Sequence, residues 1–141
     1  MIGVRILCHG TLKEDYLKDA CAEYMKRLTA YCKPEILEAK DDRALAALIR
    51  EKDYNIALCV EGKELSSPEL AQMIDRLPNE GVSSLSFVIG GSDGLPEETK
   101  KLCQFRLSFS KMTFPHQLMR VILLEQIYRA FNINHGGKYH K

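Results

Sequence analysis

The chain has 141 residues, of which 45% are hydrophobic and 28% charged, and its formal net charge at pH 7 is +1. This composition excludes a disordered chain, and the length predicts a single globular domain over residues 1–141. No apolar run approaches the roughly 18 residues of a membrane-spanning helix, and no signal-peptide pattern is present, so we expect a cytoplasmic protein that makes no membrane contact.

Strand and helix patterns then alternate along the chain. Residues 2–8 alternate apolar and polar side chains like a half-buried strand, and apolar residues at 17–31 recur at helical spacing. A strand at 35–38 follows Pro34, and a helix with an acidic first turn is expected from residue 41 to about residue 52.

The second half of the chain continues in the same way. Residues 56–62 are a continuous apolar run, which is typical of the centre of a parallel sheet. Ser67 and Pro68 mark the next helix as N-cap and first-turn proline. The remaining elements are expected as strands at 84–90 and 105–110, a short helix at 96–103 and a terminal helix. This alternation predicts an α/β fold with a mostly parallel sheet flanked by helices.

The terminal helix is apolar on almost every side over residues 118–131. Such a helix must be covered all round, although it lies near a chain end, where fraying is usual. A second copy of the chain is the simplest cover, so we expect a homodimer.

Three connections lie where ligands bind in open parallel sheets, at the carboxyl ends of strands. They are residues 58–62, the Gly-Gly turn at 89–94 and the loop SKMTFP at 110–115. Paired glycines let main-chain groups approach a flat ligand closely. A tight strand-to-helix turn is the plainer explanation of this pair, and its spacing does not match the dinucleotide fingerprint GxGxxG.

The SKMTFP loop is the more informative of the three. Pro115 favours an extended Phe114, and Thr113 can cap the following helix. Main-chain groups of this loop, together with Phe and Met side chains, could then hold an adenine. Ordinary core packing of Met112 and Phe114 is the alternative.

Charge is concentrated near the end of the sequence. Residues 101–141 carry seven Lys or Arg, a single Glu and three of the four histidines. The acidic residues 51–100 could neutralise this segment, or its cations could form a local polyanion site. Rings, amides and cations alternate over the last residues, which suits unstacked RNA bases and their phosphates.

Other reactive side chains favour structural roles. The five cysteines form no CxxC pair and lie in apolar stretches, so buried reduced thiols are expected rather than disulfides or a metal site. Cys8 and His9 point to opposite faces of a strand, which disfavours a nucleophile pair, and His9 is expected to be a satisfied loop histidine. Glu125 and Arg129, one helical turn apart, predict an ion pair.

Four segments of the chain resemble the RlmH family, the SPOUT-class methyltransferases that modify N3 of a pseudouridine in bacterial 23S ribosomal RNA. They are IALCVEGK, FVIGGSDGL, LSFSKMTFPHQLMRVILLEQIYRAF and the closing YHK, and the resemblance covers essentially the whole chain. It implies a SPOUT-type sheet with a C-terminal trefoil knot, a homodimer, and S-adenosylmethionine bound by the knot loops. A chain this small, with no appended RNA-binding domain, makes the assembled ribosome the expected substrate.

The resemblance also assigns residues. The family's cofactor contacts correspond here to Leu58, Gly90, Phe109, Ser110, Lys111, Met112, Thr113 and Phe114. Its RNA-receiving tail implies Tyr139, His140 and Lys141, with Arg120 and His116 as nearby candidates. Lys138 departs from the family, whose members often have proline there, but as a cation of the same tail it is also expected to contact RNA.

His140 is our candidate for the catalytic group that assists loss of the proton from N3, because imidazoles titrate near neutral pH. A residue of a second subunit, a water molecule or the ribosomal RNA itself could serve instead. No metal site is expected.

Other functions remain open. A nucleotide-binding oxidoreductase would need a pyrophosphate at the Gly-Gly turn, but the GxGxxG spacing is missing. A non-catalytic ribosome-binding factor would need only the basic tail. A SPOUT methyltransferase acting on another RNA is the third alternative.

Overall fold

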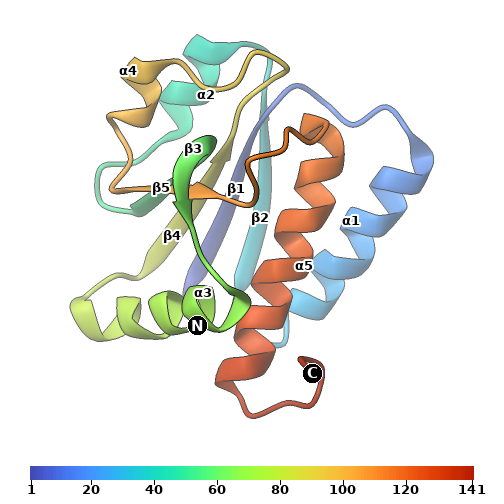
Figure 1. The fold of residues 1–141 in the computed structure, drawn as a ribbon, viewed down its shortest axis with the longest axis vertical. Helices are drawn as coiled ribbons and strands as arrows, with labels where there is room; N and C mark the ends of the chain where they lie inside the picture. Colours follow the sequence, from blue (N-terminus) through green and yellow to red (C-terminus); the bar gives the residue numbers. More distant parts are fainter.

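Five parallel strands form a single sheet in the order β2-β1-β4-β3-β5 in the computed structural model, which describes residues 1–141 (Figure 1). The predicted α/β fold with a parallel sheet flanked by helices is confirmed. In chain order the elements are β1 (Gly3–His9), α1 (Asp15–Leu28), β2 (Lys33–Ala39), α2 (Asp42–Leu48), β3 (Tyr54–Glu64), α3 (Ser67–Arg76), the short 3-10 helix η1 (Leu77–Glu80), β4 (Ser84–Ile89), α4 (Glu97–Lys100), β5 (Phe105–Ser108) and α5 (His116–Asn134).

Helices cover both faces of this sheet. The larger core lies between the sheet and α1, α3 and α5, where Ile6, Phe87 and Leu123 are fully buried. On the other face, α2 and the region of α4 cover a smaller core around Leu7 and Val88. The result is three layers, with α5 running across the middle of the larger core between α1 and α3 (Figure 1). None of the helices combines the length and apolar composition that a membrane span requires.

Strand β1 is buried on both faces, which corrects the expectation of a half-buried strand. Arg5 and Leu7 are buried as well as Val4 and Ile6, because β1 lies between β2 and β4 with helices above and below. The apolar run at 56–62 belongs to β3, but the central strand is β4. Sequence pattern indicates burial and not strand order, so it could not show which of β3 and β4 lies at the centre of the sheet.

Strand β3 bends at residues 58–62, the first of the three segments predicted to bind a ligand. Leu58 and Lys63 both pair with Leu107 of β5, so the residues between them bulge out of the ladder. Gly62 allows this bend, since a Cβ there would lie 2.8 Å from main-chain atoms of Arg106. The bulge carries Cys59 and the two residues after it over the carboxyl end of the sheet.

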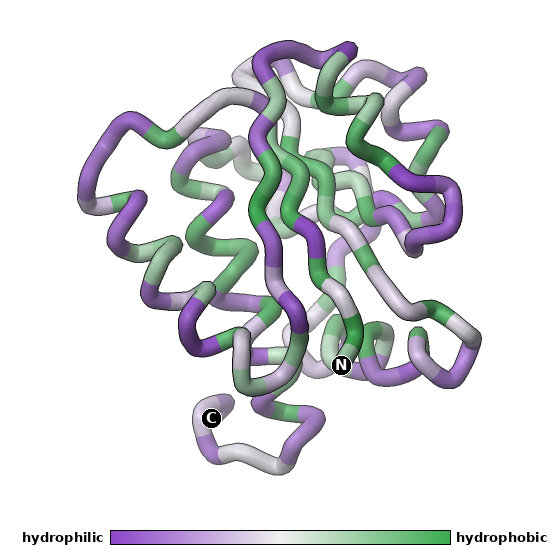
Figure 2. The backbone as a smooth tube through the Cα atoms, turned by 180° about the vertical axis from the view of Figure 1, so that it is seen from behind, coloured by the Kyte–Doolittle hydropathy of each residue, from purple (hydrophilic) through white to green (hydrophobic).

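Hydrophilic residues lie among the hydrophobic ones along the strands (Figure 2). Near the amino ends of the strands, four polar or charged residues are buried: Arg5, Asp53, Asn55 and Ser86. Asp53 accepts from Arg50 at 2.8 Å and from Arg5 at 3.3 Å, and Ser86 donates to the Asn55 amide oxygen. These side chains satisfy one another with hydrogen bonds, as buried polar groups usually do. This network stabilises the end of the sheet that lies away from the three predicted loops.

Two helix starts differ from the sequence prediction. Ser66, not Ser67, caps α3: its hydroxyl accepts from Glu69 N at 3.2 Å while Glu69 accepts from Ser66 N at 2.8 Å, a capping box. Ser67 is therefore free to bond elsewhere. Helix α5 begins after Pro115 without any side-chain cap, so the predicted cap at Thr113 is wrong.

Candidate ligand site at the carboxyl end of the sheet

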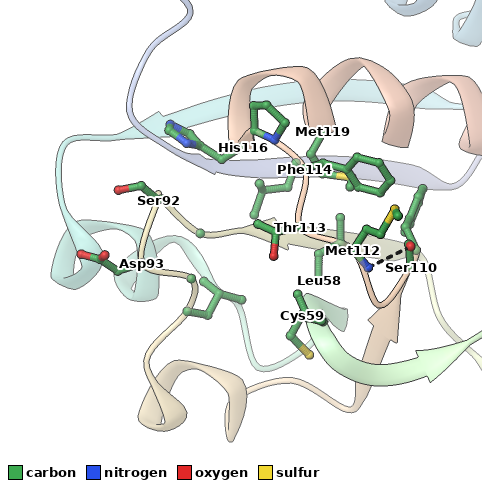
Figure 3. Close-up of a pocket in the computed structure, with 18 of the residues that line it drawn as sticks. Leu58, Cys59, Ser92, Asp93, Ser110, Met112, Thr113, Phe114, His116 and Met119 are labelled. Carbon is green, nitrogen blue, oxygen red and sulfur yellow. Dashed lines mark hydrogen bonds between the residues drawn. The ribbon is translucent and has the colours of Figure 1, made fainter.

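The three loops predicted to hold a ligand meet around one cavity of about 660 Å³. This volume lies within the range of about 300–1,000 Å³ that is common for small-molecule sites. Figure 3 shows the loops converging on it from β3, β4 and β5, with the first turns of α5 above. The lining residues are 58–61, 89–95, Leu107, Phe109, Ser110, 112–116 and Met119.

The Gly-Gly turn forms one wall. Gly91 and Gly94 pair as an isolated bridge, and Gly94 N donates to Gly91 O at 3.0 Å. Gly94 has a φ of +77°, which other residues rarely adopt. A Cβ on Gly90 would lie only 2.6 Å from the carbonyl carbon of Gly94. Glycine at position 90 is thus required for the turn to close on itself, in addition to any role in admitting a ligand.

The SKMTFP loop forms the opposite wall. Ser110 organises it: its hydroxyl accepts from Met112 N at 3.0 Å, and its carbonyl accepts from the Ser108 hydroxyl at 3.0 Å. Met112 is 75% exposed, so core packing does not account for it. Seven of the eight residues assigned to a cofactor by resemblance line the cavity, and Lys111, which is exposed, does not.

Titratable groups around the cavity are few and dispersed. The Lys100 side chain donates a hydrogen bond to Glu61 and lowers the pKa of that carboxyl group. Burial raises the pKa of the Cys59 thiol. Burial, with His9 and Arg120 nearby, lowers the pKa of His116, so its imidazole is neutral near pH 7. No group of three or more His, Cys, Asp or Glu is placed to hold a metal ion. The cavity therefore presents main chain and apolar side chains, and it presents no activated nucleophile.

The five cysteines are free thiols, but only three of them are buried. Burial raises the pKa of Cys8 to about 12, which leaves it protonated and unreactive, in agreement with the structural role expected for it. Cys59 and Cys103 are half-buried. His9 lies 3.7 Å from Asp42, and a Cβ on Gly91 would meet its ring. It is the last residue of β1 and not part of the following loop, which corrects the prediction of a loop histidine.

Arg120 was expected to contact RNA, and the structure contradicts this. Its side chain is 3% exposed and bonds Glu38 at 2.6 Å and the Gly10 carbonyl at 3.4 Å. A buried guanidinium held by a carboxylate cannot reach a phosphate. Arg120 instead ties the start of α5, directly after the SKMTFP loop, to the ends of β1 and β2.

Replacing Glu38 with glutamine should lower the free energy of unfolding by about 1–2 kcal/mol, because the Arg120 charge stays buried with a weaker partner. Urea denaturation would measure this change. Glu35→Gln is the control, since Glu35 is exposed on the same strand and lies 3.6 Å from Arg5. Equal losses for the two variants would contradict a special role of Glu38 in holding the buried Arg120.

The C-terminal tail lies at the other end of α5, far from the cavity of the same chain (Figure 1). Nineteen helical residues separate the two ends, which is about 28 Å. The tail is also docked: Tyr139 donates to Glu125 at 3.0 Å, and Arg129 contacts His140 at 3.1 Å and Glu125 at 2.8 Å. The predicted Glu125–Arg129 ion pair is confirmed, and it anchors the tail.

The basic segment is neutralised only in part. Arg106, Arg120 and Arg129 form ion pairs, but only Arg106 pairs with the acidic middle of the chain, at Glu97. The lysines form none, and those at 111, 138 and 141 are exposed at the two ends of α5. The cations free to meet a polyanion are therefore lysines beside the cavity and lysines on the tail.

Thirteen of the 20 lining residues lie outside the cofactor contacts assigned from sequence, and three of them are informative. Cys59 and Glu61 line the cavity through the β3 bulge, and Met119 lines it from α5. The loop at 58–62 was recognised, but its bulge comes from the register shift against β5, which no local pattern reports. Met119 follows the loop by one helical turn, and this spacing was the available signal.

Known proteins resemble this chain in sequence and in fold. A family model described as "Predicted SPOUT methyltransferase" matches residues 2–140. Proteins named "Ribosomal RNA large subunit methyltransferase H" from Bacillus thuringiensis and Clostridium novyi are each 48% identical over an alignment of 159 positions, which covers 99% of this chain and the whole of each relative. The resemblance found in the four sequence segments is confirmed.

Solved structures agree at the level of fold. A methylase-family protein of Haemophilus influenzae has a TM-score of 0.64 at 12% identity, covering 99% of this chain and 71% of its own. A Legionella pneumophila protein described as a methyltransferase, in complex with the bound cofactor SAM, has a TM-score of 0.50 at 10% identity, covering 92% of this chain and 66% of its own. The parallel sheet carries a cavity that three loops build at its carboxyl end. The family model matches residues 2–140, and relatives are 48% identical along their whole length. The chain therefore belongs to the SPOUT methyltransferase family.

Proposed function

We propose that this protein transfers a methyl group from S-adenosylmethionine to N3 of a pseudouridine in 23S ribosomal RNA. The observation that carries the proposal is the cavity formed by all three predicted loops in a chain 48% identical to proteins named for large-subunit ribosomal RNA methylation. The paired cations and rings at the far end of α5 support an RNA substrate. Because bacterial ribosomes are cytoplasmic, we place the enzyme in the cytoplasm.

The cavity suits the proposed cofactor. Its apolar side chains, including Leu58, Met112 and Phe114, can enclose an adenine, and the main chain of residues 90–95 and 109–114 offers donors and acceptors for the ring edge and the sugar. When bound, S-adenosylmethionine supplies an activated methyl group and a neutral thioether as leaving group. The protein's part is to fix the acceptor in line and to exclude water, which needs no protein nucleophile.

The acceptor nitrogen carries a proton that has to leave. Among the tail residues, His140 has an exposed imidazole whose Nδ1 lies 3.1 Å from Arg129 Nη1. We propose that this imidazole assists proton loss while Arg129 orients it. The residues proposed for RNA contact are now Lys138, Tyr139 and Lys141, without Arg120.

A homodimer would bring the tail to a cavity. The tail and the cavity of one chain lie at opposite ends of α5, so a partner with an antiparallel α5 would place its tail over this cavity. Leu118 is 39% exposed on α5, and Val60 and Met112 are 46% and 75% exposed at the cavity rim. These apolar side chains beside the cavity support an interface there.

Replacing Leu118 with glutamate should therefore weaken the dimer at least about 10-fold, because a charge would enter an apolar interface. Light scattering over a dilution series would report the dissociation constant. Tyr16→Glu is the control, since Tyr16 is 69% exposed in the first turn of α1 and does not line the cavity. A wild-type protein that is a stable monomer at micromolar concentration would contradict the dimer.

We also propose the trefoil knot implied by the family. Strand β5 lies at one edge of the sheet, yet α5 returns to the middle and reaches Glu38 and Gly10 at the other side. This return path is compatible with threading of the C-terminal segment. Chains pulled from both ends should then stay shorter than full extension of about 3.6 Å per residue, and an extension that reaches this length would exclude a knot.

The proposed function is tested by titration of the cofactor and by an assay of methyl transfer. S-adenosylmethionine, but not NADH, should bind in calorimetry, and labelled methyl should appear at N3 of a pseudouridine by mass spectrometry. We expect intact ribosomes to be better substrates than free 23S RNA, because few unpaired cations are available to hold free RNA. NADH binding would favour an oxidoreductase, and ribosome binding without transfer would favour a non-catalytic factor.

A further inference from the structure

The end of α5 and the tail form one hydrogen-bonded cluster around Arg129. Arg129 Nε and Nη2 both donate to Glu125 Oε1, at 3.0 and 2.8 Å. The guanidinium carbon lies 4.7 Å from the centre of the Tyr139 ring, and the Tyr139 hydroxyl donates to Glu125 Oε2 at 3.0 Å. The guanidinium is therefore held on one edge and on one face, which leaves Nη1 as the corner that reaches beyond this pair.

This corner meets His140. Arg129 Nη1 lies 3.1 Å from His140 Nδ1, and Asn132 Oδ1 accepts from Tyr139 N at 3.2 Å, which fixes the main chain directly before the histidine. A guanidinium group can only donate hydrogen bonds. Nδ1 has to be the acceptor, since a proton on it would set one N–H group against another. The imidazole in this contact is thus neutral and carries its proton on Nε2.

The nitrogen Nε2 is the one that remains available to a substrate. His140 is exposed, and the contact with Arg129 is the one hydrogen bond that its side chain makes. Acting as a base through either nitrogen would put a proton on Nδ1 and break that contact. As held in the structure, the imidazole offers a donor and not a base.

We propose that His140 acts in methyl transfer as a hydrogen-bond donor, through Nε2–H to a carbonyl oxygen beside N3, and that Glu125 and Arg129 are positioning residues that keep its proton on Nε2. This inference rests on the proposed function, and it states how His140 assists the loss of the proton from N3.

The chemistry of the acceptor ring supports a donor. N3 of a uracil-type ring is flanked by two carbonyl oxygens, and negative charge spreads onto both when N3 loses its proton. A fixed N–H group beside one of these oxygens stabilises that charge as it develops. The proton of N3 passes to a water molecule, and the N3 electron pair forms the bond to the methyl carbon. The electron pair of the broken carbon–sulfur bond stays on sulfur, and the protein takes up no proton.

The test compares two amide variants of His140. The amide nitrogen reaches about as far as Nε2 in His140→Gln, but only as far as Nδ1 in His140→Asn. An amide donates a hydrogen bond but does not act as a base near neutral pH. Single-turnover methyl transfer to ribosomes should stay within about 10-fold of wild type in His140→Gln and fall roughly 100- to 1,000-fold in His140→Asn, the usual effect of removing one donor to a developing anion. Affinity for S-adenosylmethionine should stay at the wild-type value in both.

Glu125→Gln tests the positioning role. An amide holds Arg129 less firmly than a carboxylate does, so the proton of His140 can move to Nδ1, and transfer should fall about 10-fold. In the His140→Gln background the same change should cost less than about 2-fold, because an amide has no second tautomer to adopt. Glu80→Gln is the control, since Glu80 pairs with Arg76 at the same helical spacing, at 3.4 Å. It should leave transfer unchanged.

Three results would overturn the proposal. Loss of transfer in His140→Gln as large as in His140→Asn would show that the imidazole itself takes up the proton. Transfer by His140→Asn at or above the rate of His140→Gln would exclude a donor at Nε2. Equal losses from Glu125→Gln in the two backgrounds would show a purely structural role of Glu125. Failure of the proposed function is seen separately, because the wild-type protein itself would then transfer no methyl group.

Discussion

Replacing Gly90 with alanine should weaken S-adenosylmethionine binding roughly 100-fold, because the added methyl group has nowhere to go. The new Cβ would lie 2.6 Å from the Gly94 carbonyl carbon and 2.8 Å from Leu95 N. Both are main-chain atoms of the same turn, so neither can swing aside. The whole 90–95 wall of the cavity must shift, and the main-chain groups proposed to meet the cofactor shift with it.

Gly91→Ala separates this effect from a general intolerance of the turn. Its Cβ would lie 2.8 Å from His9 Nδ1, which belongs to a side chain that can rotate away. We expect its affinity to stay within about 5-fold of wild type. Calorimetric titration of both variants, with circular dichroism to establish folding, makes the comparison. Wild-type affinity in both variants would show that the turn is not part of the cofactor site, and an equal loss in both would show a general intolerance of the turn.

The sequence contained enough to predict the layers and the location of the site. Apolar periodicity is a local property, so alternating strands and helices and the three loops at 58–62, 89–94 and 110–115 were accessible. Strand order depends on pairing between distant segments. The central position of β4 and the bulge in β3 therefore appeared only in the structure.

Arg120 shows a signal that was present and misread. It precedes Leu124, Ile127 and Phe131 by four, seven and eleven residues, so it lies on the buried stripe of α5. A cation in that phase predicts a buried side chain that needs a carboxylate partner, as found with Glu38. It was named as a candidate for RNA contact through the resemblance to a family with an RNA-receiving tail. Helical phase is the better guide to the environment of a charged side chain.

No local signal indicated that the tail is docked on the fold. Polar residues at a chain end usually form a segment that is free of the fold. Instead, Asn132 accepts from Tyr139 N at 3.2 Å, and the Tyr139 ring packs on Tyr128 at 5.1 Å. Both contacts are made by a chain that reverses at Gly136, where φ is +71°. That reversal depends on how α5 ends, which periodicity does not report.

Deleting residues 139–141 should abolish methyl transfer to ribosomes while leaving cofactor affinity unchanged, because the tail lies at the far end of α5 from the cavity. Loss of the Tyr139 contacts should cost about 1 kcal/mol of stability, since an aromatic pair contributes roughly 0.5–1.5 kcal/mol. His140→Ala should lower the transfer rate more than ribosome affinity. Lys141→Ala should lower affinity and its dependence on salt. Wild-type transfer by the truncated protein would remove His140 from the mechanism.

Mixing the two defective proteins decides which cavity a tail serves. The truncated protein keeps an intact cavity, and Gly90→Ala keeps an intact tail. If a tail acts on the partner's cavity, a mixed dimer has one complete site, and random exchange of subunits should restore about one quarter of the wild-type rate. If a tail acts on its own cavity, no mixed dimer has a complete site and the mixture stays inactive. The separation of about 28 Å along α5 favours restoration, because a docked tail cannot cover that distance within one chain.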